Sequence, residues 1–308
     1  MTTSVSTTTS AYYDRSANDL ANLRVQMERT QTQIASTHKL VSSSDDPLTA
    51  SRLRNLARQD TLGKIDAGAA NRATADLNLG DSAMTEIINT LQRVRQLANQ
   101  AATGTVSDEQ RASIGNELGE LRGNLISLAN SRDSAGHALF GGDAAGDAYS
   151  LDPVTGLVSY IGSGTAGTLA LGDGQSVQRT LTGPEFLSFT SGGAPTDVFA
   201  ALKTITDAIS AGGSGAQSAA NAALTTLDEA ITAVSTGQTV VGTRLSWIDL
   251  ATQRQTTMSE ARAQDEATLG ATDIPTAYTR LQELATVLQA SQAAFTKISG
   301  LSLFTMMA

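Results

Sequence analysis

The chain has 308 residues, of which 40% are hydrophobic and 17% are charged, so it is long and apolar enough to bury a core. Its formal net charge of −9 argues against a nucleic-acid-binding protein, because contacts with phosphates need a basic surface. It has no cysteine, which excludes disulfides, thiolate catalysis and cysteine-ligated zinc. No stretch approaches the roughly 18 consecutive apolar residues of a membrane-spanning helix, so we expect no membrane insertion.

The chain starts with the polar stretch MTTSVSTTTS. This stretch has neither the basic flank nor the apolar centre of a secretory signal peptide. We therefore expect no cleaved signal peptide, and export of the protein would need another route.

A seven-residue apolar repeat marks both ends of the chain. Such a repeat keeps one narrow stripe of a helix facing a partner helix and drives left-handed supercoiling. We therefore expect the two terminal helices to pack together and to form an assembly interface. Its residues are predicted to be Tyr13, Leu20, Met27, Ile34 and Val41 near the start and Ile274, Leu281, Leu284, Leu288, Phe295 and Ile298 near the end.

The first terminal helix is predicted to extend to Val41 and to stop at the polar stretch that follows it. Asp45, Asp46 and Pro47 form a predicted helix break, because proline is favoured at the first helical position and aspartate caps free N–H groups. Helix capping is the ordinary interpretation of these carboxylates, ahead of direct contact with a partner. The sequence Asp273-Ile274-Pro275 predicts a second break before the C-terminal repeat.

Helical periodicity also covers the middle of the chain, on both sides of a glycine-rich stretch. A second helix is predicted to reach about Ala102, and Ser107 with Gln110 fits the capping box of a third. From Gly141 to Pro195 the composition shifts to glycine and short β-favouring runs. The predicted fold class is therefore mainly α with a small inserted β-domain, arranged as an elongated helical bundle plus terminal coiled-coil helices.

These patterns give a nested domain organisation. Residues 1–43 are predicted to form an N-terminal assembly helix that pairs with the C-terminal assembly helix in residues 269–308. Residues 44–140 and 196–268 are predicted to supply the two halves of a helical bundle. Residues 141–195 form the predicted β-rich domain inserted between those halves.

The sequence offers no site for catalysis, for a cofactor or for a metal. His38 and His137 are the two histidines, and neither has a second ligand at metal-binding spacing nearby. The turn at Gly141-Gly142-Asp143 lacks the Lys-Ser/Thr that completes a phosphate-binding loop. We therefore expect a protein that is not an enzyme and that binds no cofactor.

Several short motifs follow one another along the chain. They are the block from Gln33 to Val41, the stretch Ser44-Asp45-Asp46-Pro47-Leu48-Thr49-Ala50-Ser51, the step Leu139-Phe140-Gly141-Gly142, the stretches 152–156 and 181–186, and the ending Gly300-Leu301-Ser302-Leu303-Phe304. In this order they resemble the flagellar hook–filament junction proteins, also called hook-associated protein 3, which are related to flagellin. The chain departs from that family at Thr37-His38-Lys39, where a glycine followed by basic residues is common.

The resemblance implies a structural layer between the hook and the flagellin filament. The implied partners are a neighbouring hook-associated protein, flagellin, further copies of the chain in a ring, and an export chaperone. The implied location is the extracellular flagellum, reached by the flagellar type III export route. Leu301, Leu303 and Phe304 would contact the chaperone or export machinery, or would pack as a helix end in the assembled tube.

The narrow terminal stripes add an expectation about the free protein. Ordering a backbone costs about 1–2 kcal/mol per residue, which one narrow stripe of apolar contacts offsets poorly. We therefore expect the termini to be mobile before assembly and to fold onto neighbours during it.

Two other functions compete with the junction protein. Flagellin shares the helical ends, whereas the Asp46-Pro47 break and the ending Ser302-Leu303-Phe304 favour the junction protein. A helical signalling protein, such as the cytoplasmic bundle of a receptor, has similar Ala, Gln and Glu repeats. The glycine-rich insertion and the lack of an apolar span count against that class.

Overall fold

The computed structural model describes residues 3–172 and 174–307. The chain divides into two compact units, and each is described by itself below. Unit 1 comprises residues 1–62 and 258–308, and unit 2 comprises residues 63–257. Two long helices, α2 (Pro47–Ala102) and α6 (Gly213–Gly270), contribute residues to both units.

Unit 1 contains the terminal helices α1 (Thr3–Ser36) and α7 (Ile274–Met307). Helix α1 ends because Thr37 takes a φ of 59°, in the left-handed region. The Thr272 N–H then donates to the Thr37 carbonyl at 2.9 Å. The prediction that the first helix reaches Val41 is therefore wrong, and Val41 lies in the connecting loop with 46% of its surface exposed.

The left-handed conformation at Thr37 gives a stability prediction. A β-branched residue is strained there by about 1–2 kcal/mol, whereas glycine is not. We expect Thr37→Gly to raise the free energy of unfolding of unit 1 by about 0.5–1 kcal/mol, because glycine's greater freedom in the unfolded chain offsets part of the relief. Thr37→Ala, which keeps a Cβ, is the matched control in the same urea titration, and an equal gain from both variants would contradict the explanation.

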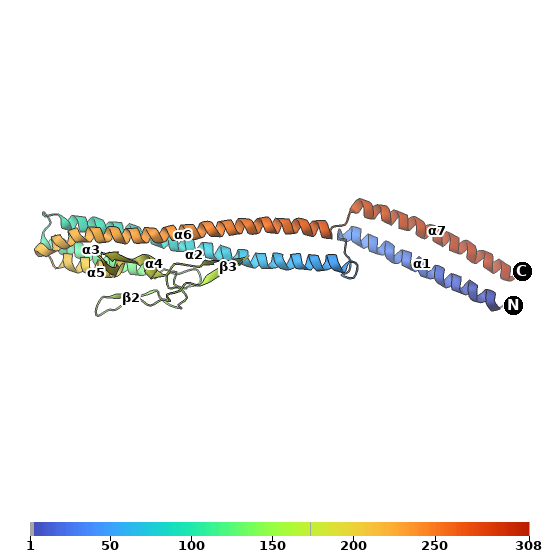
Figure 1. The fold of residues 1–308 in the computed structure, drawn as a ribbon, viewed down its shortest axis with the longest axis horizontal. Coiled ribbons are helices and arrows are strands. Elements are labelled where there is room, and N and C mark those ends of the chain that lie inside the picture. Colours follow the sequence, from blue (N-terminus) through green and yellow to red (C-terminus); the bar gives the residue numbers. More distant parts are fainter. Residues whose placement is uncertain (1–2, 173, 308) are drawn as a thin grey trace. The chain divides into compact units, whose positions relative to one another are not determined.

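Unit 2 is a helical bundle of α2, α3 (Asp108–Ala129), α5 (Val198–Ser210) and α6 (Figure 1). Its core repeats at heptad spacing, so each long helix buries one stripe. On α2 the stripe includes Leu77, Met84, Ile87, Leu91 and Val94, and on α6 it includes Leu227, Val234, Val241 and Ile248, all at most 2% exposed. The predicted capping box of α3 is present, with Ser107 and Gln110 each bonded to the other's backbone N–H.

Within its described residues, the segment between α3 and α5 holds three separate antiparallel hairpins. They pair β1 (Tyr149–Leu151) with β2 (Val158–Tyr160), β3 (Thr168–Gly172) with β4 (Gln175–Gln178), and β5 (Ser188–Ser191) with β6 (Ala194–Asp197). A short helix, α4 (Gly183–Leu187), separates β4 from β5. The expectation of a mainly α protein with a small inserted β-domain is confirmed.

Aromatic side chains attach this inserted segment to the helices of unit 2. The rings of Phe140 and Phe186 lie 4.8 Å apart, and those of Tyr149 and Phe199 lie 5.0 Å apart. Phe186 packs directly over Gly237 of α6, where a Cβ would come within 2.5 Å of it. The insertion therefore shares the core of the bundle instead of forming a core of its own.

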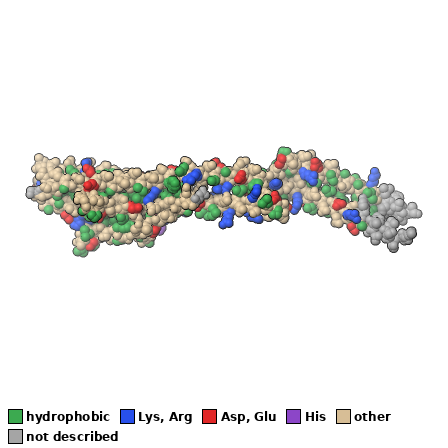
Figure 2. Space-filling model, viewed as in Figure 1, with side chains coloured by type: hydrophobic (Ala, Val, Ile, Leu, Met, Phe, Trp, Pro, Cys, Tyr) green, Lys and Arg blue, Asp and Glu red, His purple; other side chains and the backbone are tan. Residues whose placement is uncertain are grey.

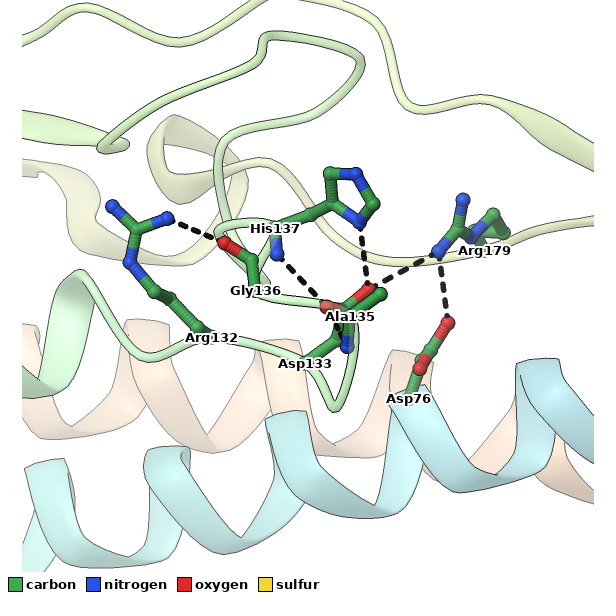
Figure 3. Close-up of polar contacts among 7 residues, drawn as sticks. All are labelled: Asp76, Arg132, Asp133, Ala135, Gly136, His137 and Arg179. Carbon is green, nitrogen blue, oxygen red and sulfur yellow. Dashed lines mark hydrogen bonds and ion pairs between the residues drawn. The ribbon is translucent and has the colours of Figure 1, made fainter.

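A cluster of charged residues fastens the loop after α3 to α2 (Figure 3). The carboxylate of Asp133 accepts hydrogen bonds from the N–H groups of Ala135 and His137, at 2.8 and 2.9 Å. Arg179 then bridges Asp133 and Asp76 of α2, at 3.4 and 3.1 Å. Burial alone would raise the pKa of Asp133, but the hydrogen bonds and the His137 side chain hold that pKa below its usual range.

The lowered pKa of Asp133 predicts how stability responds to acid. The ionised carboxylate stabilises the folded state above the unfolded pKa of about 4, and this contribution is lost as pH falls through the lower folded pKa. We expect Asp133→Asn to lower the unfolding temperature at pH 7 and to flatten its decline between pH 4 and pH 2. Thermal unfolding across that range measures this effect. Asp249→Asn, at an exposed position of α6, is the control and should follow the wild-type curve.

Among residues 3–172 and 174–307, no helix is both long and apolar enough to cross a bilayer. In the same part of the chain, no group of three or more His, Asp or Glu side chains is placed to hold a metal ion.

Candidate assembly interface

The terminal helices α1 and α7 lie side by side in unit 1 and run antiparallel (Figure 1). Two contacts fix their register. Near the chain ends, the rings of Tyr13 and Phe295 meet edge to face with centroids 5.6 Å apart. At the other end, the Lys39 N–H donates to the Gly270 carbonyl at 2.8 Å, just before α7 begins. The two apolar repeats therefore face each other along both helices.

The α1 side of this contact consists of one stripe. Tyr13, Leu20, Met27 and Ile34 are half-buried, as members of the predicted repeat. The structure adds the positions between them, which sequence reasoning missed: Ser16, Leu23 and Thr30. Thr30 is only 8% exposed, and its hydroxyl is satisfied by donating to the Gln26 carbonyl at 2.9 Å. A polar residue therefore occupies the most buried described position of α1, which an apolar-only search overlooks.

On α7 the burial is uneven along the predicted repeat. Leu284 and Leu288 are 5% and 9% exposed, and Leu281 and Phe295 are half-buried. Ile274 and Ile298, nearer the two helix ends, are 39% and 41% exposed. The contact between the two stripes is thus most buried near its middle. No described apolar residue of α1 is as buried as Leu284.

The seam between the helices is incompletely filled. A hollow of about 190 Å³ lies beside it, lined by Ser16, Leu20, Leu23, Ser291 and Phe295 among others. Serines at facing core positions leave space that larger apolar side chains would occupy. Val25 and Val287, which lie off the seam, are 53% and 48% exposed. The pair therefore retains apolar surface that it does not cover by itself.

The predicted break at Asp45, Asp46 and Pro47 lies where α2 begins. Helix α2 starts at Pro47, and Asp46 accepts hydrogen bonds from the Thr49 N–H at 3.0 Å and hydroxyl at 2.6 Å. The Thr49 hydroxyl and N–H hold the pKa of Asp46 below its usual range. Asp45 faces back toward α1, where it pairs with Arg29 at 3.0 Å. These contacts are local: Asp46 caps α2, and the Asp45 pair closes the loop between α1 and α2.

Three predicted contact residues cannot be placed. The side chains of Leu301, Leu303 and Phe304 lie outside the described residues, although the backbone of α7 continues to Met307.

Comparison with known proteins finds similarity to flagellar proteins. Residues 5–145 match the bacterial flagellin N-terminal helical region. The chain is 27% identical over 188 residues to flagellar hook-associated protein 3 of Salmonella typhimurium, which covers 61% of this chain and 58% of that one. It is 31% identical over 163 residues to a flagellin of Listeria monocytogenes, covering 49% and 56%. The chain thus matches little more than half the length of these relatives.

The fold has a solved counterpart as well. The crystal structure of flagellar hook-associated protein 3 from Legionella pneumophila superposes with a TM-score of 0.63 at 15% identity, covering 70% of this chain and 98% of that chain. At that identity the likeness shows a shared fold. Residues 5–145 of the chain are therefore similar to the bacterial flagellin N-terminal helical region, and the chain is similar in sequence to flagellar hook-associated protein 3 and to flagellins.

Proposed function

We propose that this protein is a structural, non-enzymatic component of the bacterial flagellum that joins the hook side to the flagellin filament. The sequence similarity to the Salmonella hook-associated protein 3 supports this function. So does the shared fold with the Legionella protein of the same name. The observation that carries the proposal is the antiparallel seam of α1 and α7, which brings the two ends of the chain together as one assembly element.

In this proposal the seam is completed by neighbours. In a tube, identical helix pairs would cover three surfaces of this pair. These are the half-buried stripe of α1, the hollow beside Leu20, and the exposed Val25 and Val287. Copies of the chain would form a ring, with a hook-associated protein on one side and flagellin on the other. The termini would become fully ordered only in that setting, because the pair alone buries little surface.

The route to the flagellum follows from the same proposal. The protein would be exported by the flagellar type III route without cleavage of a signal peptide, and a chaperone would bind its C-terminal segment before export. Leu301, Leu303 and Phe304 are the proposed contacts for that chaperone.

Deletion of the gene tests the function. We expect cells that keep their hooks, lack filaments and release unassembled flagellin into the medium, because flagellin then has no layer on which to polymerise. Expression of the wild-type chain from a plasmid should restore filaments. Normal motility in the deletion strain would refute the proposal.

Flagellin remains the alternative function, and the similarity to the Listeria flagellin supports it. A flagellin polymerises with itself without limit, whereas a junction layer stops after a defined number of copies. Electron microscopy of the concentrated, purified protein separates the two. Micrometre-long filaments would identify a flagellin, and their absence together with the shed flagellin described above would identify the junction protein.

A further inference from the structure

The hairpin of β1 and β2 presents an apolar tip to solvent. Val154 at its turn is 91% exposed, and the flanking Leu151 and Leu157 are 45% and 51% exposed. Figure 2 shows hydrophobic side chains at the surface of unit 2 at the place where β2 lies in Figure 1. An apolar side chain exposed so fully at a loop tip contributes nothing to the fold of its own chain.

The tip is nonetheless held in one conformation. The Asp152 carboxylate accepts hydrogen bonds from the Val154 N–H at 2.8 Å and the Thr155 N–H at 3.3 Å. The Gly156 N–H donates to the Asp152 carbonyl at 2.8 Å, and Gly156 has the positive φ of 67° that this turn needs. Arg122 of α3 also donates to the Gly156 carbonyl. A loop held in this way loses little entropy when it binds.

An apolar groove lies elsewhere on the same unit. It has a volume of about 510 Å³ and runs between the hairpin of β5 and β6, helix α5 and the start of α6. Its lining includes Pro195, Ala201, Ile205, Ala208, Ala219 and Ala222. One water occupies about 30 Å³, so the groove has room for several side chains.

The tip and the groove of one chain cannot meet, because they lie on opposite sides of α5. Lys203 of α5 lies next to Gly156 at the tip, within 3.6 Å of where a Cβ would stand. The groove is lined by Ala201, Thr204, Ile205 and Ala208 of the same helix. At 3.6 residues per turn, these side chains point roughly 100–160° away from Lys203. The tip of one chain can therefore enter only the groove of another.

We propose that the tip at Val154 of one copy inserts into the α5–α6 groove of the next copy, which adds a second, head-to-tail contact to the ring of the proposed function. Two different surfaces of one chain that fit each other make a heterologous interface, which closes into a ring when the rotation allows. The inference rests on the proposed function, because it needs copies arranged around an axis.

The size of the contact favours a second copy over an independent partner. A hairpin tip in a groove buries a few hundred Å², well below the roughly 1,200 Å² that a stable interface needs by itself. A free partner would therefore bind too weakly to persist. A neighbouring copy already held by its α1–α7 helices has a high effective concentration, so a small contact suffices.

Disulfide trapping tests the contact directly, since the natural chain has no cysteine. We propose the double variant Val154→Cys/Ala208→Cys, produced in the deletion strain, with flagella purified under oxidising conditions. We expect a ladder of dimers, trimers and larger species on a non-reducing gel, because every copy then carries both halves of the link. Each single variant, and the pair Val154→Cys/Ser113→Cys with its second cysteine exposed on α3, should stay monomeric.

Each outcome decides between the two proposals. Flagella that contain the double variant but show no ladder, or only dimers, would overturn the head-to-tail contact and leave the junction function intact. Absence of the wild-type chain from flagella would overturn the junction function itself.

If the double variant fails to assemble, a second variant still tests the contact. Val154→Asp should leave the unfolding temperature unchanged, since the side chain is exposed, yet should increase the fraction of filaments lost under shear. Filament retention equal to wild type would also overturn the contact.

Discussion

Replacing Leu284 by aspartate should leave cells with hooks but without filaments. Leu284 is 5% exposed in the seam between α1 and α7, so an aspartate there must lose its hydration or separate the helices. Loss of the leucine packing alone costs about 2–5 kcal/mol, and the added charge increases that cost. A pair of two helices has too little stability of its own to offset this cost. The proposed interface would therefore not form.

Motility in soft agar and the flagellin content of the medium measure this effect. Gln282→Asp is the matched control, because it adds the same charge to an exposed position of α7 two residues away. It should swarm like the wild type. The unfolding temperature of unit 2 should be equal in both variants, since both substitutions lie in unit 1. Equal swarming by Leu284→Asp and Gln282→Asp would show that the seam is not needed for assembly.

Gly115→Ala should destabilise unit 2, because α3 and α5 pack closely at this position. A Cβ at Gly115 of α3 would stand 2.0 Å from the Ser210 Oγ, 3.0 Å from its Cβ and 3.2 Å from its Cα on α5. The hydroxyl can rotate away, but the Cα moves only if the helices separate. We expect the free energy of unfolding to fall by about 1–3 kcal/mol, although alanine is the better helix former by about 1 kcal/mol.

The same helix supplies the controls for that experiment. Gly119 and Gly123 of α3 have nothing within 4 Å of a built Cβ, so their replacement by alanine should stabilise the protein by about 0.5–1 kcal/mol. Ser210→Ala should restore only part of the loss in Gly115→Ala, because the Ser210 backbone stays in place. Urea unfolding of the four variants checks this order. A gain in stability from Gly115→Ala would mean that α3 and α5 are not closely packed there.

The helices were the most predictable part of the fold, because heptad spacing is visible wherever one stripe of a helix is buried. Leu77, Met84 and Leu91 of α2 carry that signal clearly. The end of α1 was not predictable from spacing, because Val41 continues the repeat while Thr37 turns the backbone. The departure from the family's glycine at Thr37-His38-Lys39 was the available signal, since glycine is the residue that a left-handed φ favours.

The continuity of α6 and the arrangement of the strands were harder to predict. Gly237 and Gly242 weaken the helical signal locally, yet α6 continues through both. At Gly237 the missing side chain makes room for Phe186, which is a tertiary reason that local propensity does not reveal. The β-favouring runs were visible, but their division into three separate hairpins depends on which turns and aromatic contacts form.

The candidate interface was predicted in outline and incompletely in composition. The apolar residues at the predicted seven-residue spacing were found. The intervening Ser16, Leu23 and Thr30 of α1 were missed, because two of these three positions are polar and no second apolar repeat is visible there. The groove left no signal in the sequence, because it depends on how distant elements meet in space. Exposure of a valine at a turn becomes informative only once the fold is known.

The position of the protein on intact flagella is the most direct test of the central claim that paired terminal helices build a layer between hook and filament. Immunogold labelling of purified hook–filament preparations, with an antibody against this chain, measures that position. We predict label confined to a narrow band where the hook meets the filament, and none there in the Leu284→Asp strain. Label spread along the whole filament would contradict the account and identify a flagellin.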